Sequence, residues 1–136
     1  PLERPAHTIE TKEADMSYFK TNESVTAQAI KTVEGKKAHG DIILKAMMSG
    51  DEMTMLEIRY APGAGTPMHV HKHESVVYVM SGRVAMVVGK EHYELGPGDA
   101  CRHPQGVPHS VEGIEESVVL EIKSPPVPLD LFLGMD

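Results

Sequence analysis

Glycine and proline interrupt this chain at short intervals, and that spacing limits what the chain can fold into. Between positions 35 and 113 the breaks fall at Gly35, Gly40, Gly50, Pro62-Gly63, Gly82, Gly89, Gly96-Pro97-Gly98, Gly106 and Gly113. Runs rich in Val, Ile, Met and Leu lie between them, namely Asp41–Met48, Met53–Tyr60, Ser75–Met80, Arg83–Val88 and Ser117–Ile122. Short apolar runs between turn residues are typical of strands in an all-β sandwich or barrel. No window carries the apolar periodicity of a long helix.

The length of the chain, 136 residues, is that of one ordinary domain. We expect an N-terminal arm over residues 1–24, a β-barrel over residues 25–128, and a tail over residues 129–136 that packs on the barrel or on a partner subunit. The prolines at 125, 126 and 128 are predicted to end the last strand, because proline has no N–H for the ladder. The polar arm and the apolar tail are candidates for contacts between subunits, so we expect a homodimer.

The charge balance disfavours several classes of partner. With 13 basic and 20 acidic residues the formal net charge is −7, whereas nucleic-acid backbones and anionic membrane surfaces attract clustered Lys and Arg. No segment approaches the roughly 20 apolar residues that span a bilayer. The single cysteine, Cys101, excludes an internal disulfide, and no charged-then-apolar leader opens the sequence. We therefore expect a cytoplasmic protein whose partner is a small molecule.

Histidines are concentrated in one part of the sequence. Of the eight in the chain, six fall between positions 69 and 109; His92 is isolated among them, and the other five are His69, His71, His73, His103 and His109. On an extended strand His69, His71 and His73 would share a face with Ser75, and Glu74 would point to the opposite face. Two imidazoles at positions i and i+2 are able to converge on one ion, and a third from a neighbouring strand would complete the set. The alternative interpretation is a group of surface histidines.

Two segments around these histidines carry a recognisable pattern. The first, GAGTPMHVHKHESVVYVMSG, runs from Gly63 to Gly82, and the second, GDACRHPQGVPHSVEG, runs from Gly98 to Gly113. They resemble the two signature motifs of the cupin superfamily, G-x5-H-x-H-x3,4-E-x6-G and G-x5-P-x-G-x2-H-x3-N. The matched positions are Gly63, His69, His71 and Gly82 in the first motif, and Gly98, Pro104, Gly106 and His109 in the second. The resemblance, to small single-domain cupins, implies a double-stranded β-helix (jelly-roll) barrel of the RmlC-like type.

The same resemblance implies one divalent metal ion, such as Fe, Zn, Ni or Mn, held by His69, His71 and His109. The sequence departs from the family pattern at two positions. Ser75 occupies the place of the family's metal-binding glutamate, and Gly113 occupies the place of the final asparagine. The expected set of ligands is therefore three histidines, completed by Ser75 or by water. Three neutral imidazoles leave the charge of the ion uncompensated, so we expect it to favour an anionic ligand.

Other residues have a functional and a structural interpretation. His73 and His103 are candidates for proton transfer during catalysis, and His73 has two alternatives, a fourth metal ligand or a place at the pocket rim. Cys101 is interpreted as a small buried apolar residue. Arg59 and Arg102 are interpreted as solvated surface charges, with a carboxylate clamp as the alternative. A further residue, Tyr78, alternates away from His69 and is expected in the core.

The favoured function is that of a metal-dependent enzyme acting on a small, anionic, oxygen-rich molecule. The sequence does not choose between a dioxygenase, an isomerase, a decarboxylase and a lyase. The alternative is a non-catalytic, metal-dependent domain that binds or senses a small molecule. A metal-free structural protein is the third interpretation, and the intact His69, His71 and His109 argue against it.

Overall fold

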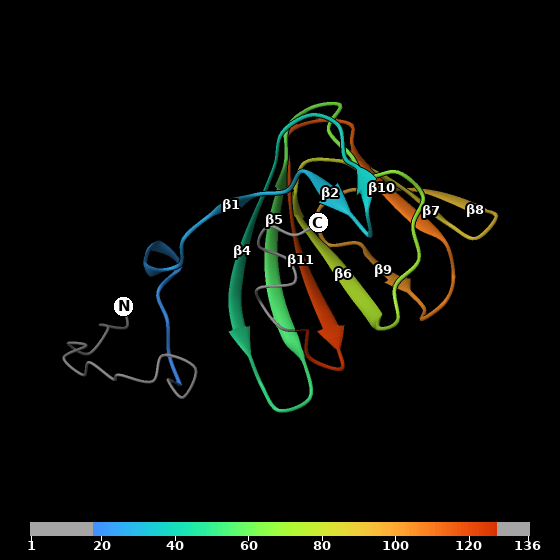
Figure 1. Ribbon diagram of the computed structural model, residues 1–136. Helices are drawn as coiled ribbons and strands as arrows, with labels where there is room; N and C mark the ends of the chain where they lie inside the picture. The colour runs from blue at the N-terminus through green and yellow to red at the C-terminus, as the bar shows by residue number, and fades with distance from the viewer. Residues whose placement is uncertain (1–17, 128–136) are drawn as a thin grey trace.

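The structure is a computed structural model and describes residues 18–127, which form a set of antiparallel strands (Figure 1). The strands are β1 (Gln28–Ala29), β2 (Thr32–Val33), β3 (Lys36–Lys37), β4 (Ile42–Ser49), β5 (Thr54–Tyr60), β6 (Glu74–Ser81), β7 (Val84–Val88), β8 (Glu91–Leu95), β9 (Ala100–His103), β10 (His109–Gly113) and β11 (Ser117–Ser124). Between residues 18 and 127 the helical structure is one 3₁₀ turn, Asn22–Ser24. Within that range no helix has the length and apolar character needed to cross a membrane.

The strands form two main sheets. The larger sheet has the order β1-β4-β5-β11-β6-β9, the smaller one has the order β10-β7-β8, and β2 and β3 form a separate hairpin. In Figure 1 the two sheets converge at one end of the molecule and enclose the space between them. The fold is a double-stranded β-helix, or jelly-roll barrel, which confirms the fold class predicted from the sequence.

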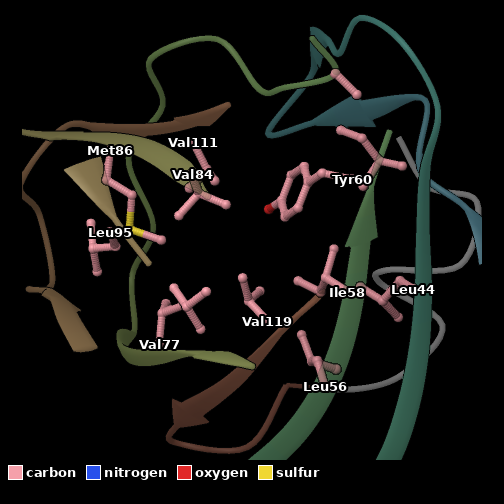
Figure 2. Packing of buried hydrophobic residues seen from close by; sticks show 13 residues of the cluster. Leu44, Leu56, Ile58, Tyr60, Val77, Val84, Met86, Leu95, Val111 and Val119 are labelled. Carbon is pink, nitrogen blue, oxygen red and sulfur yellow. The ribbon is translucent and has the colours of Figure 1, made fainter. Parts of the chain in front are cut away.

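Alternation along the strands builds the interior of the barrel. On β5 every second residue from Thr54 to Tyr60 is buried, and on β6 the buried positions are Ser75, Val77 and Val79. Figure 2 shows apolar side chains of the large sheet facing those of the small sheet across the core. Full burial of each such side chain contributes on the order of 1.5–3 kcal/mol. The core therefore holds the two sheets together.

The five strands expected from the apolar runs are all present, as β4, β5, β6, β7 and β11. The last of them, β11, ends at Ser124 immediately before Pro125, as predicted. The pattern did not reveal β8, because four of its five residues are exposed and only Leu95 is buried. Residues 1–17 of the expected arm and the whole of the expected tail lie outside the described residues.

One expectation about β6 is wrong. Tyr78 points away from the histidine face, as its position in the alternation requires, but its side chain is 48% exposed and does not belong to the core. The inward face of β6 carries Ser75, Val77 and Val79. The histidine face and the core face of this strand are thus the same face, and the opposite face is the outer surface of the barrel.

The β2–β3 hairpin borders the cavity of the barrel. Its two-residue turn is Glu34-Gly35, and both residues have positive φ angles, 52° and 77°. Two positive φ angles are typical of the tight turn whose twist matches that of the flanking strands. Glycine adopts this conformation at no steric cost, whereas glutamate does so rarely. The turn brings the Glu34 carboxylate next to an imidazole of the candidate site.

Candidate metal centre

Main-chain hydrogen bonds bring the two histidine segments together. The N–H groups of His69 and His109 each donate to the other's carbonyl, at 3.0 Å. The N–H of Gly106, which has a φ of 78°, donates to the carbonyl of His71 at 3.1 Å. The expectation that one regular strand runs from His69 to Ser75 is therefore corrected. The segment pairs with the turn of the second motif, and β6 begins only at Glu74.

The imidazoles of His69, His71 and His109 converge in the interior of the barrel. Their ring centroids lie 4.6 Å apart for His69 and His71, 4.3 Å for His69 and His109, and 5.2 Å for His71 and His109. One ring nitrogen from each lies within 4.8 Å of the other two. The three residues are 5%, 9% and 3% exposed. This is the grouping that the sequence predicted for a metal ion.

A hydrogen bond at Nδ1 fixes the orientation of each of the three rings. The Nδ1 atoms of His69 and His109 contact the carbonyl oxygens of Pro67, at 2.7 Å, and Val107, at 3.1 Å. In His71 the contact is with the Glu34 carboxylate, at 2.7 Å. A carbonyl or carboxylate oxygen only accepts, so Nδ1 carries the proton in each ring and Nε2 keeps its lone pair. Three Nε2 lone pairs from buried, oriented imidazoles are a donor set that fits a divalent ion.

Burial keeps these imidazoles neutral, as metal ligation requires. Desolvation lowers the pKa of His69 to about 4 and that of His71 further still. The pKa of His109 is lowered for the same reason, against the hydrogen bond to Val107, which raises it. An ion arriving at neutral pH therefore does not have to displace protons from these rings.

His73 and His103 flank the three converging rings. The ring of His73 stacks on that of His71 with centroids 4.4 Å apart, and the ring of His103 stacks on that of His109 at 4.2 Å. Within residues 18–127, Nε2 of His73 and both ring nitrogens of His103 are buried without a hydrogen-bond partner. Burial lowers the pKa of each imidazole to about 4. Both residues line the same cavity as the three converging histidines.

Ser75, which occupies the place of the family's glutamate, and its neighbour Glu74 differ in direction. Ser75 is 1% exposed, and its hydroxyl accepts a hydrogen bond from Nζ of Lys123 at 3.1 Å. Glu74 points outward and accepts a hydrogen bond from Arg102 at 3.2 Å, so its expected direction is confirmed. The role of Ser75 as a metal ligand stays a prediction. Because a hydroxyl oxygen has two lone pairs, the contact with Lys123 leaves one of them available.

Three other residues considered from the sequence, Arg59, Arg102 and Cys101, are not among the residues that line the cavity of the converging rings. Arg59 and Arg102 are exposed, as expected for solvated charges. Cys101 is partly buried and packs against the apolar core. Burial raises the pKa of its thiol, so the thiol is the dominant form at neutral pH.

The cavity contains charged residues that sequence reasoning missed. It has a volume of about 550 Å³, and besides the five histidines its lining includes Tyr60, Glu121, Lys123 and the hairpin residue Glu34. A charged pair at positions i and i+2 of an apolar strand, here Glu121 and Lys123, was a signal available in the sequence. For Glu34 the only signal in the sequence was the Glu-Gly turn. Its contact with His71 could not be predicted, because the two residues are 37 positions apart.

A family model described as the cupin domain matches residues 56–123, which run from within β5 to Lys123 near the end of β11. The chain belongs to the cupin family. The matched range contains all five clustered histidines together with Glu121 and Lys123, whereas Glu34 precedes it. The resemblance read from the two motifs is thereby confirmed.

Comparison with individual cupins gives the same fold. Oxalate decarboxylase OxdC of Bacillus subtilis is 28% identical over 81 residues, which are 56% of this chain and 21% of the decarboxylase. The chain thus spans about a fifth of that relative's length. An RmlC-like cupin from Shewanella frigidimarina superimposes with a TM-score of 0.71 at 22% identity, covering 80% of this chain and 91% of the other. KdgF from a Halomonas species gives a TM-score of 0.70 at 24% identity, covering 85% and 98%.

Proposed function

We propose that this cupin is a metal-dependent enzyme that holds one divalent ion through His69, His71 and His109 and acts on a small, anionic, oxygen-rich molecule. The observation that carries the proposal is the convergence of three buried imidazoles whose Nδ1 atoms all face acceptors. A divalent ion bound there, with Fe, Zn, Ni and Mn as candidates, would polarise a carbonyl or enolate oxygen of the ligand. The three uncharged ligands favour an anion beside it.

His73 and His103 are proposed to move protons at the bound molecule. Both residues line the cavity beside the three converging histidines, and within residues 18–127 Nε2 of His73 and both ring nitrogens of His103 have no hydrogen-bond partner. Their lowered pKa values keep both rings neutral near pH 7, so each has a nitrogen able to accept a proton. Ile42, Leu44 and Ile58 form apolar walls of the same cavity. A carboxylate substrate is supported by the relative whose name is oxalate decarboxylase.

The experiment that tests this function separates metal binding from chemistry. Chelator-treated protein is reloaded with Fe²⁺, Mn²⁺, Zn²⁺ or Ni²⁺ and assayed for turnover of small carboxylic acids. We expect turnover only with metal, and we expect His103→Phe to keep the metal but to lower turnover by about 100-fold or more. His92→Phe, on the exposed strand β8, is the matched control and should act like wild type. Equal turnover without metal, or unchanged turnover in His103→Phe, would contradict the proposal.

We propose a homodimer formed through the outer face of the large sheet. Val76, Tyr78 and Met80 of β6 are about half exposed there, and the first two pair with Ile122 and Leu120 of β11. Together they form an apolar strip that a second copy would cover. The expected result is a dimer mass in light scattering at micromolar concentration, and conversion to monomer by Tyr78→Glu. A strictly monomeric wild type would overturn the proposal.

The partner is proposed to be a small molecule rather than a nucleic acid, because the net charge of −7 repels phosphate backbones. A cytoplasmic location is proposed as well. It is supported by the use of a single cysteine in the sequence, which is typical of proteins in reducing compartments.

A further inference from the structure

A lysine and a glutamate lie inside the barrel, at the end of the cavity formed by β11. Glu121 is 7% exposed and Lys123 is 3% exposed, and both side chains line the cavity that holds the histidines. Nζ of Lys123 donates to Oε2 of Glu121 at 2.7 Å and to Oγ of Ser75 at 3.1 Å. These positions continue the inward face of β11, whose preceding member is the core residue Val119. A charged pair therefore stands where the barrel would accommodate apolar side chains.

Stability gives no reason for this pair. Taking two charges out of water has a large desolvation cost, and apolar residues of similar volume are often equally or more stabilising in the same place. The surface pair Glu74–Arg102 carries no such cost, because both of its side chains are about half exposed or more. A buried ion pair that faces a cavity is, in contrast, placed where a ligand can use it.

The ammonium group of Lys123 lies beside the position that distinguishes this chain from the family pattern. In the pairing of β11 with β6, Lys123 is opposite Ser75. Ser75 replaces the glutamate of the first cupin motif. A glutamate there would bring its carboxylate to Nζ, whereas serine supplies only a neutral hydroxyl. Because Lys123 lines the cavity, the carboxylate that this chain lacks at position 75 could instead be supplied by a bound molecule.

We propose that Lys123 is the residue that recognises a carboxylate group of the ligand. The carboxylate replaces the Ser75 hydroxyl as acceptor of the Nζ hydrogen bond, and that hydroxyl donates to the same carboxylate in turn. Glu121 holds the ammonium group in place through their 2.7 Å hydrogen bond. The inference rests on the proposed function and deepens it, because it assigns the anionic group of the substrate to the carboxylate class and gives that group a protein partner besides the metal.

The test uses oxalate as the probe and its uncharged analogue oxamide as the control ligand. Each is titrated calorimetrically into Zn²⁺-loaded protein, and the metal content is measured after each titration. We expect wild type to bind oxalate and to bind oxamide at least about 100-fold more weakly. The variant Lys123→Met/Glu121→Leu removes both charges together, so that neither is left buried alone. It should bind oxalate about 100-fold more weakly than wild type with unchanged zinc content.

Two further variants sharpen the result. Ser75→Glu places a carboxylate within the protein opposite Lys123, and it should also lower oxalate affinity while zinc stays bound. Lys90→Met removes one lysine from the exposed β7–β8 turn, outside the residues that line the cavity, and should bind oxalate like wild type.

Wild-type oxalate affinity in the double variant, with zinc present, would overturn the role of Lys123 and leave the proposed function intact. Zinc-loaded wild type that fails to bind oxalate would overturn it as well. Wild type that binds no divalent ion at all would instead overturn the proposed function. The zinc measurement therefore distinguishes failure of the carboxylate site from failure of the metal site.

Discussion

Replacing His109 by alanine is expected to lower the affinity for a divalent metal by more than about 100-fold, because it removes one of three imidazole ligands. His69→Ala and His71→Ala should have effects of the same size. The reason is geometric, since the ring nitrogens of the three residues lie within 4.8 Å of one another and no two of them would hold the ion as well. The measurement is a titration with Zn²⁺ in the presence of a competing chelator.

Two glutamates provide the graded controls for this experiment. Glu34→Ala removes the acceptor on Nδ1 of His71 and should lower metal affinity by about 10- to 100-fold, as is usual for residues that orient a ligand. Glu74→Ala should leave metal affinity unchanged, because its carboxylate faces Arg102 on the outer surface. A large loss for Glu74→Ala together with no loss for His109→Ala would require a different set of ligands.

Lys123→Met is expected to destabilise the fold by about 3–5 kcal/mol, because it leaves the Glu121 carboxylate buried without its cation. Burial by itself raises the pKa of Glu121, and it is the charge and hydrogen bond of Lys123 that bring this pKa down to about 2. Without Lys123 the carboxyl group must either take up a proton or remain charged in the interior. The measurement is the free energy of unfolding from urea denaturation at pH 7 in the metal-free protein.

Two further variants distinguish the effect of removing the whole Glu121–Lys123 pair from the effect of removing Lys123 alone. Lys123→Met/Glu121→Leu should recover most of the stability lost in the single variant, since no unpaired charge stays buried. Arg102→Met breaks the exposed pair with Glu74 and should change the free energy of unfolding by about 1 kcal/mol or less. If Lys123→Met were no more destabilising than Arg102→Met, the buried Glu121 carboxylate would not depend on Lys123 to compensate its charge.

The convergence of His69, His71 and His109 was predictable because the information that specifies it is local. A His-x-His pair and a third histidine in the matching second motif are sufficient to bring the three residues to one site. The outward direction of Glu74 also follows from local alternation. Alternation does not reveal which face of a strand lies inside, however, and that is why Tyr78 was assigned to the core although it lies on the outer surface. In this barrel the core side chains and the converging histidines share the inner face.

The rest of the site depends on contacts between residues far apart in the sequence. Glu34 meets His71 only because a two-residue hairpin turn lies against the cavity, and that turn precedes the first motif. Lys123 meets Ser75 through the register of β11 against β6, which places positions 48 apart side by side. No spacing rule connects such residues. The charged pair on β11 was nevertheless visible in the sequence as two charges two residues apart, and therefore on one face, of an otherwise apolar strand.

A crystal of metal-loaded protein, measured at the absorption edge of the metal, tests the central claim most directly. We predict one anomalous peak per chain, about 2.0–2.2 Å from each Nε2 atom of His69, His71 and His109. The Nδ1 atoms should keep their contacts with Pro67, Glu34 and Val107. A peak bound to other residues, or a peak on the Nδ1 atoms, would contradict the account.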